Sequence, residues 1–364
     1  MLLDLPSNRT ESWRWSDLSA LPALAQRPAG VAPLGEMREL PWIDCAPGGP
    51  RLLFVNGKLD ASRSEPGAVE IAQLALDPRG HPLGSQAGTT GWELKLGRAH
   101  AASAPIQIVH VTTGGADQLP ASVVLDVDAQ ASIVETFMGE GWANRLTGIT
   151  LFRGARLMLS RRLLGKSGFV SLTDRASIGE GASLTQVTLA AGGTDSRIDG
   201  EMVLAGKAAF AEAGGALLAR DKQRHDVNLV LRHEQPSGMS RQVWRSVADG
   251  RSTCSVAARV EVARGAQKTD GEQSLKGLLL DRAATINAKP ELEIFADDVK
   301  CAHGATVGEL DRNALYYLAS RGIPLHEAKA LLTQAFVADA IDRIGEEAVR
   351  DAFHADAMAW LGAS

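Results

Sequence analysis

The sequence predicts a mainly β protein whose core is a parallel β-helix, and three observations support this fold class. Between residues 121 and 310, short segments alternate apolar and polar residues, which is the period of strands with one buried face. A short motif of small residues recurs in the same region at a nearly constant spacing along the sequence. Aromatic residues make up only 5% of the chain while glycine provides 37 of its 364 residues, and stacked coils accept small residues at their corners.

The recurring motif has a small residue, an alanine, any residue, and then leucine or isoleucine. Its alanines are Ala131, Ala155, Ala182 and Ala208, separated by 24, 27 and 26 residues. A nearly constant step indicates repeating coils. A β-sandwich is the alternative, because its strands also recur every ~8 to 12 residues. The strand segments with the clearest alternation are 122–128, 186–189 and 290–294.

The part of the chain before the predicted β-helix, residues 1–120, is predicted to be a small α/β domain. The apolar run 51–55 is followed by Asn56 and Gly57, which tolerate the positive φ of a tight turn. We therefore expect a strand and a hairpin there. A weaker helical pattern covers residues 67–76. The β-helix core is assigned to residues 121–310.

Residues 311–364 are predicted to form a helical domain. Asp311 is a suitable N-cap, Gly322 a suitable helix end, and Pro324 a suitable first helical position. A final helix is expected at 346–360. The helix that starts at Pro324 should bury an apolar stripe at spacings of three and four residues. This stripe consists of Ala328, Leu331, Leu332, Ala335 and Phe336.

Charge and composition exclude several classes of partner. The net charge of −5 gives no cationic field for nucleic acid, and no apolar stretch approaches the ~20 residues that span a bilayer. The three cysteines, Cys45, Cys254 and Cys301, form no CxxC pair, and the N-terminus has no secretory signal. A reducing cytoplasm is the predicted location.

The sequence contains no recognisable catalytic or phosphate-binding motif, but residues 296–306 include a Cys-x-His pair. On a strand, Cys301 and His303 project to the same face, where thiolate and imidazole could reach a metal or an iron-sulfur species. Two ligands are too few, so further donors must come from elsewhere in the chain or from another subunit. The alternative is that Cys301 is a small apolar residue of the core and His303 a hydrogen-bonded core or interface residue.

The other polar and aromatic candidates have simpler explanations. His225 and His233 lie in a charged segment that is typical of a solvated face. Asp297 and Asp298 fit a turn, because adjacent residues of a strand point to opposite faces. The pair at 316–317 is either core filler or a surface for a partner.

Two longer runs carry a resemblance to a known family. Residues 289–311 and 315–323 closely resemble the SufB/SufD family of iron-sulfur cluster assembly proteins, and the segments 9–17, 240–242 and 267–270 support the match. SufB-like members tend to carry additional cysteines, so the scarcity of cysteine here favours the SufD branch. Ala319 stands where the family usually has an arginine.

The resemblance implies a right-handed parallel β-helix between a small N-terminal domain and a C-terminal helical domain. It also implies a non-catalytic scaffold subunit that pairs with SufB through the β-helix, whereas the ATP chemistry belongs to the SufC ATPase. No resident cofactor is implied, only a transient iron-sulfur cluster at the interface with SufB. In isolation, a homodimer is the alternative to the SufB pairing.

Two sets of residues match functional positions of the family. Cys301 and His303 match the junction between SufB and SufD, where SufB would provide the missing ligands. The implied SufC-docking surface consists of Leu315, Tyr316, Tyr317, Leu318, Arg321, Gly322 and Ile323. Two other functions remain open: a purely structural stabiliser of SufB and SufC without a cluster ligand, and a β-helix enzyme that processes polysaccharides. The enzyme would need a set of carboxylates on an open face, which the sequence does not show.

Overall fold

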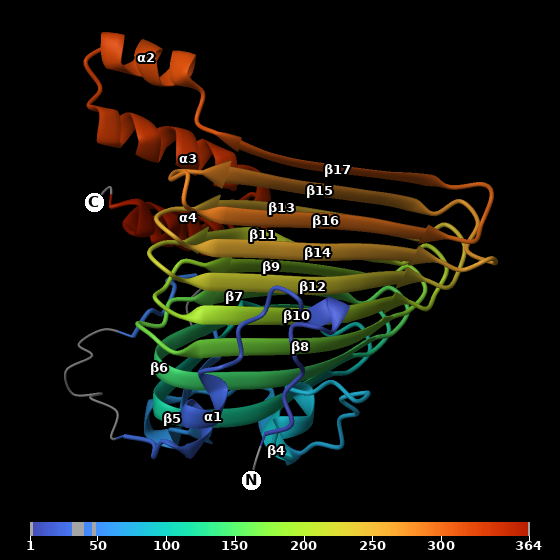
Figure 1. Cartoon of the computed structure of the whole chain (residues 1–364). Helices are drawn as coiled ribbons and strands as arrows, with labels where there is room; N and C mark the ends of the chain where they lie inside the picture. The colour runs from blue at the N-terminus through green and yellow to red at the C-terminus, as the bar shows by residue number, and fades with distance from the viewer. Residues whose placement is uncertain (1–2, 31–39, 46–48, 363–364) are drawn as a thin grey trace.

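The computed structural model describes residues 3–30, 40–45 and 49–362, and its main body is a solenoid of two parallel sheets (Figure 1). Two long strands, β5 (Ile106–Leu125) and β6 (Gln130–Leu151), contribute to both sheets at the base. Sheet 1 continues from β6 through β7 (Arg156–Leu163), β9 (Ser183–Ala190), β11 (Phe210–Ala219), β13 (Met239–Ala248), β15 (Asp270–Leu279) and β17 (Lys300–Glu309). Sheet 2 continues through β8 (Phe169–Ile178), β10 (Asp195–Leu204), β12 (Arg224–His233), β14 (Thr253–Val262) and β16 (Thr285–Ile294).

The strand pairing confirms the parallel β-helix. Every pairing from β5 to β17 is parallel, whereas a β-sandwich is built from antiparallel strands. The register along sheet 1 advances by 26, 27, 27, 29, 31 and 30 residues from coil to coil. The coils therefore lengthen toward the C-terminus, and the predicted step near 26 describes only the first of them.

The alanines at the corners of the coils differ in part from the predicted repeat. The buried corner alanines are Ala129, Ala155, Ala182 and Ala209, each fully buried and in register from coil to coil. The predicted Ala155 and Ala182 belong to this ladder. The predicted Ala208 does not, because it lies exposed in a turn with a φ of 54°.

Residues before β5 cover the first coil. β1 (Arg51–Val55) and β2 (Lys58–Leu59) form the predicted hairpin, in which Asn56 and Gly57 have φ values of 47° and 74°. The expected helix at 67–76 is wrong: this segment contains strand β3 (Val69–Gln73), which pairs antiparallel with β4 (Thr90–Leu96). β1 and β4 then pair in parallel with β5. The predicted domain boundary at residue 120 falls inside β5.

Short helices complete the part of the chain before β5. The 3-10 turn η1 (Glu11–Trp13) and the helix α1 (Leu21–Gln26) lie in a segment in which Trp13, Leu21 and Leu24 are buried. Two further 3-10 turns are η2 (Ala61–Arg63) and η3 (Gly84–Gln86).

Three helices follow the last strand: α2 (Arg312–Ser320), α3 (Leu325–Ile341) and α4 (Glu347–Leu361). Asp311 caps α2 by accepting a hydrogen bond from the Asn313 amide at 2.8 Å, and Gly322 has the positive φ of 83° that a tight chain reversal needs. Pro324 is the N-cap of α3 and not its first helical residue, so the helix begins one residue later than predicted. No helix in the described ranges is both long enough and apolar enough to cross a membrane.

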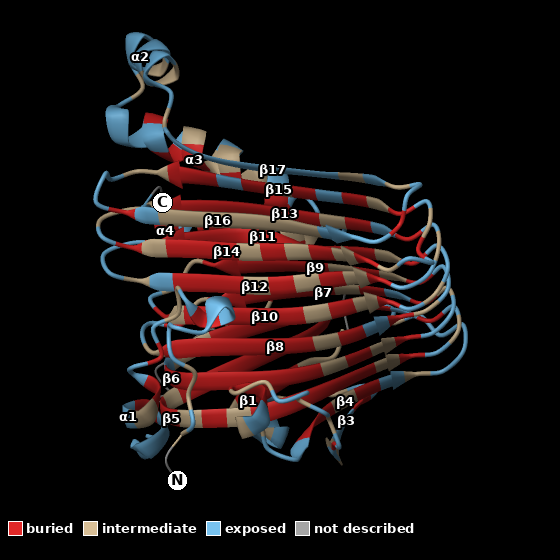
Figure 2. Cartoon of the chain, turned by 45° about the vertical axis from the view of Figure 1, so that its right-hand side comes forward, coloured by how far each residue is buried: buried red, intermediate tan, exposed pale blue. Residues whose placement is uncertain are grey.

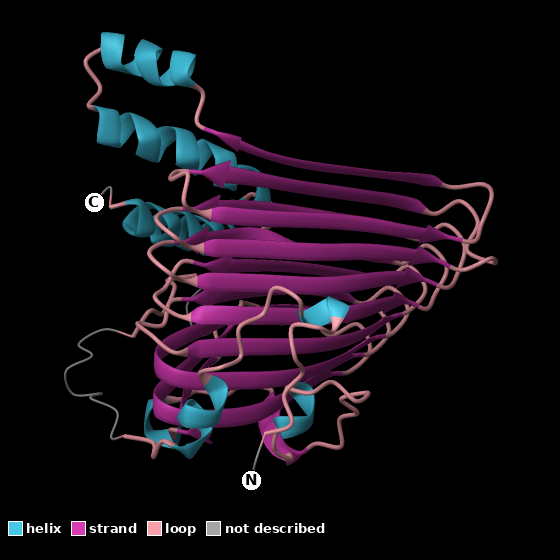
Figure 3. Cartoon of the chain, viewed as in Figure 1, coloured by secondary structure: helices cyan, strands magenta, loops and turns pink. Residues whose placement is uncertain are grey.

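α3 and α4 pack on the outer face of sheet 1, while α2 extends beyond the solenoid (Figure 3). Val337, Ile341 and Phe353 contribute to an apolar cluster with side chains of β9, β11 and β13. Arg162 also pairs with Asp356 of α4 at 2.6 Å, and Arg245 pairs with Asp339 of α3. The predicted stripe of α3 is wrong in part, because only Ala328 of its five residues is fully buried.

Candidate functional site

The last coil of the solenoid is an open end. Among the described residues, β16 pairs only with β14 and β17 pairs only with β15, so each presents one unpaired edge. Burial falls along the stack, from the mostly buried β14 to the half-buried β16 and the mostly exposed β17 (Figure 2). A coil gains its buried inner face from the next coil, and within the described ranges no coil follows β16 and β17.

Cys301 and His303 both point to the inner side of this open end. They are in register with Gly271 and Gln273 of β15, whose inner positions are buried in the lumen of the solenoid. Because alternate residues of a strand share a face, the predicted placement of the two side chains on one face agrees with this register. Within the part of the chain that the structure describes, no group of three or more His, Cys, Asp or Glu side chains is placed to hold a metal ion.

Cys301 is half-buried, and its surroundings are partly those of a packing residue. Its sulfur lies 3.4 Å from where a Cβ of Gly271 would stand, so the thiol packs closely against β15. Burial raises the pKa of the Cys301 thiol, against an opposing hydrogen bond from the Gly271 backbone. The thiol is therefore protonated at neutral pH, whereas a metal ligand has to be a thiolate. His303, in contrast, is exposed.

The residues predicted to dock a partner lie on α2 and in the turn after it. Tyr316 and Tyr317 have exposed fractions of 78% and 57%, so the alternative that they fill a core is wrong. Arg321 lies over the Tyr317 ring at 5.2 Å from its centroid. Leu315, Leu318 and Ile323 are half-buried, and Arg321 and Gly322 are exposed. Leu325 and Leu331 of α3 add exposed apolar side chains next to this segment.

The structure also contains a sealed ion network that sequence reasoning missed. Inside the first coils, Arg161 bonds Glu135 at 2.7 Å and Asp174 at 2.6 Å, and His110 bonds the other oxygen of Glu135 at 3.0 Å. All four side chains are at most 1% exposed. Burial alone would raise the pKa of Glu135, but Arg161 and His110 outweigh it and lower the pKa to about 2. The network is fully enclosed, so it fits a structural role.

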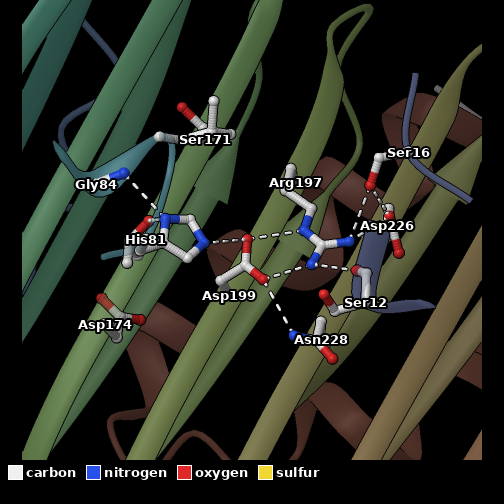
Figure 4. Close-up of polar contacts among 12 residues, drawn as sticks. Ser12, Ser16, His81, Gly84, Ser171, Asp174, Arg197, Asp199, Asp226 and Asn228 are labelled. Atoms are coloured by element: carbon white, nitrogen blue, oxygen red, sulfur yellow. Dashed lines mark hydrogen bonds and ion pairs between the residues drawn. The ribbon is translucent and has the colours of Figure 1, made fainter. Parts of the chain in front are cut away.

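A second polar cluster lies on the outer face of sheet 2 (Figure 4). Arg197 holds Asp199 with two hydrogen bonds of 2.6 and 2.7 Å and donates to the Ser12 carbonyl at 2.8 Å. His81 lies 3.1 Å from Asp199, and Ser16 bonds Asp226. The cluster fastens residues 12–16 and the 81–84 turn to the sheet.

His225 and His233 were expected on a solvated face, and this expectation is wrong. Both are buried in the lumen, where they bond Ser196 and Ser240, respectively, at 2.8 Å. Burial lowers the pKa of each imidazole to about 4. The alternation of β12 contains the signal for this placement, because His225 and His233 share the phase of Val227, Leu229 and Leu231.

The geometry defines a class of protein: a β-solenoid whose first coil is covered by its own chain and whose last coil, next to the appended helices, has unpaired strand edges among the described residues. Comparison with known families defines it further. Residues 110–336 match the family model described as SUF system FeS cluster assembly, SufBD core domain, and the chain belongs to this family.

Individual relatives agree with this assignment. The chain is 24% identical to the iron-sulfur cluster assembly protein SufD of Escherichia coli, over 95% of this chain and 87% of that protein. It is 27% identical to an iron-sulfur cluster assembly SufBD family protein of Synechocystis, over 94% of this chain and 84% of that protein. Over a shorter stretch, 25% of this chain and 21% of the relative, it is 40% identical to SufD of Bacillus subtilis.

Proposed function

We propose that this chain is a SufD-like, non-catalytic scaffold subunit of a SufBCD complex. In this role its open end pairs with SufB, its α2 and α3 surface docks the SufC ATPase, and a nascent iron-sulfur cluster forms as cargo at the junction with SufB. The observation that carries the proposal is the uncovered last coil, where two unpaired strand edges meet a Cys-x-His pair on an open inner face.

The proposed SufB contact follows from the chemistry of the strand edges. An edge strand has unpaired N–H and C=O groups, and another strand can satisfy them. The half-buried inner face of β16, including Ile286, Ala288 and Leu292, would gain cover from the same partner. A partner built on the same kind of parallel solenoid would meet both requirements, since it would offer strands at a matching spacing.

The proposed SufC contact rests on exposed apolar surface. α2 has no buried residue, yet it carries two adjacent tyrosines that face solvent. Tyrosine and arginine are enriched where interfaces concentrate their binding energy, and this segment has both. α3 connects the surface to sheet 1 through the Arg245–Asp339 ion pair, so a docked ATPase would be joined to the solenoid by a rigid helix.

At the cluster site, we propose that His303 is the principal contribution of this chain and Cys301 a secondary one. The imidazole is exposed at the junction, whereas the thiol is half-buried and its pKa is raised by burial. The other ligands of the cluster would come from SufB, because the described residues of this chain place only two donors there.

The test is co-expression of the chain with SufB and SufC, followed by affinity purification and by iron and sulfide analysis. The His303→Ala complex should assemble fully but contain much less iron and sulfide than wild type. His100→Ala is the matched control, because His100 is exposed in a loop at the other end of the solenoid. The double variant Tyr316→Ala/Tyr317→Ala should retain SufB and lose SufC.

Three results would contradict the proposal, each at a different point. Failure of the wild-type chain to co-purify with SufB would remove the pairing. Normal SufC recovery with the tyrosine variant would remove the docking surface. Normal cluster content in a Cys301→Ala/His303→Ala double variant would leave the chain a purely structural stabiliser of SufB and SufC.

A further inference from the structure

A chain of buried glutamine amides runs through the lumen and ends at His303. Gln242 of β13 and Gln273 of β15 are in register, and His303 of β17 is in register with Gln273. The two glutamines are 0% and 1% exposed. The three side chains therefore occupy the same inner position on three successive coils, and only the last one is open to solvent.

The direction of this amide chain is fixed by backbone carbonyl groups of sheet 2. Gln242 donates from Nε2 to the Arg259 carbonyl at 3.2 Å. Gln273 donates from Nε2 to the Ala258 carbonyl at 2.8 Å and to Gln242 Oε1 at 2.7 Å. A carbonyl group can only accept, so neither amide can be flipped without losing a bond.

This arrangement leaves one acceptor without a donor. Gln273 Oε1 is buried and receives no hydrogen bond from any residue in the described part of the chain. Its Nε2 is held by Gln242 of β13 and by the Ala258 carbonyl, and the residue next in register on the open side of Gln273 is His303. A buried carbonyl oxygen without a donor is unfavourable, so this atom requires an N–H from the next coil.

We propose that Gln273 is a positioning residue for His303: its Oε1 accepts a hydrogen bond from one imidazole N–H and leaves the other ring nitrogen, with its lone pair, facing the open end. A histidine that ligates a metal usually donates its second ring N–H to a carbonyl or carboxylate, which fixes its tautomer and orientation. Because His303 is exposed, its ring is free to turn toward this acceptor. The inference rests on the proposed role of His303 as a cluster ligand.

The first test measures the tautomer of His303 directly, without metal. In the isolated chain with ¹⁵N-labelled histidine, two-bond proton–nitrogen correlation spectra show which ring nitrogen carries the proton. The chain has eight histidines, and the His303 signals are those missing from the His303→Ala spectrum. We expect a single neutral tautomer for His303 and a mixture for the exposed His100. A mixture at His303 like that at His100 overturns the proposal.

Variants of the two glutamines distinguish loss of the hydrogen bond that orients His303 from a general disturbance of the lumen. Gln273→Met keeps the approximate volume and removes the acceptor, so it should convert His303 to a tautomer mixture. Gln273→Glu keeps an acceptor and should retain the single tautomer. Gln242→Met is the matched control, since the Ala258 carbonyl still holds Gln273 Nε2. An unchanged His303 tautomer in a folded Gln273→Met chain overturns the proposal. If that variant does not fold, the comparison of His303 with His100 in the wild-type chain decides the question.

The second test is a titration of the SufB and SufC complex with ferrous iron. The Gln273→Met complex should bind iron about 10- to 100-fold more weakly than wild type, as is typical for loss of a group that orients a metal-bound histidine. Equal affinity overturns the role in positioning. Failure of the underlying function gives a different result: His303→Ala would then assemble clusters normally, whatever the tautomer spectra show.

Discussion

The two ends of the solenoid contain similar side chains in opposite situations. In the first coils, His110, Glu135 and Arg161 point into the lumen and are sealed by the coils above and below them. In the last coil, Cys301 and His303 point to the same inner side, but no further coil of the described part of the chain covers them. Inward-facing polar groups are thus structural at one end and available at the other.

The difference shows that function in this fold depends on the position of a coil in the stack. A parallel coil satisfies its inner polar groups and its strand edges with its neighbours on both sides. The strands of an interior coil are therefore paired along both edges and leave no edge for a partner. The last coil keeps its unpaired edges and its inner groups for a partner, and substitutions at the two ends should have contrasting effects.

The largest expected effect is the loss of stability in Arg161→Met. The substitution leaves Glu135 and Asp174 buried without their cation, and breaking a buried ion pair on one side costs about 3–5 kcal/mol. The free energy of unfolding, measured by urea denaturation followed by circular dichroism, should fall by that amount.

The matched control for this substitution is Arg259→Met. Arg259 is a surface residue near the open end, 40% exposed in its side chain, and pairs with Glu291 at 3.7 Å. Surface ion pairs contribute about 0–1 kcal/mol, so this variant should unfold almost like wild type. Equal destabilisation by the two substitutions would contradict the contrast between sealed and open positions.

The second prediction concerns the loss of folding stability at low pH. Burial lowers the pKa of His225 and His233 to about 4, below the ordinary value of 6.5. The unfolded chain therefore binds these protons first, so stability is complete above pH 6.5 and falls as the pH drops toward 4. Each histidine contributes on the order of 3 kcal/mol to this loss. Urea denaturation at pH 7 and pH 4.5 should show a smaller loss for His225→Gln than for wild type.

The exposed His100 provides the comparison for the acid experiment. His100→Gln should leave the pH dependence of the unfolding free energy as it is in wild type, because His100 is exposed in a loop and lies outside the lumen. An equal change in both variants would show that the acid loss does not come from the lumen.

The contrast between sealed and open positions also explains how much the sequence could predict. The period of two and the recurring alanines depend on neighbours within one coil, and they correctly predict the parallel solenoid. The buried network could not be predicted, because Glu135 and Arg161 meet only when coils stack, 26 residues apart in register. The predicted exposure of His225 is wrong for the same reason. The prediction depends on the charged residues next to it in the sequence, whereas its burial comes from the neighbouring strands β10 and β14.

In the predicted site too, local sequence patterns predict some features, whereas others depend on contacts between coils or chains. The placement of Cys301 and His303 on one face needs only strand alternation, and the structure agrees with it. The exposure of Tyr316 and Tyr317 was not decided by the pattern, since an apolar helix face looks the same whether a core or another chain covers it. Gln273 has no local motif, and its position beside His303 appears only in the register of β15 and β17.

A smaller effect is expected at the base of α2. Asp311→Ala removes the side chain that accepts from the Asn313 amide, and loss of such a cap costs about 1 kcal/mol. Since α2 has no buried residue, the cost should appear as faster hydrogen exchange of α2 amides and not as a lower global stability. Asp311→Ser keeps a capping oxygen and should exchange like wild type. A drop in global stability would show that α2 is part of the solenoid core.

A small effect on stability, together with a clear effect on the pairing with SufB, is expected for Ala305→Pro. Lys300 donates its amide to the carbonyl of Thr269, the residue directly before β15, so even-numbered residues of β17 bond to β15 and odd-numbered amides face the open edge. A proline at Ala305 removes an N–H that this chain does not use, and the extended backbone before it is compatible with proline. Unfolding should change by less than about 0.5 kcal/mol, while recovery of SufB should fall.

Ala302→Pro tests the other side of the same strand. It removes an amide that faces β15, so it should destabilise the last coil as well as weaken recovery of SufB. If Ala305→Pro leaves SufB recovery unchanged, the free edge of β17 does not pair with another strand, and the open end would have to bind through its inner face alone. The two prolines therefore distinguish an edge that completes its own coil from an edge that is completed by a partner.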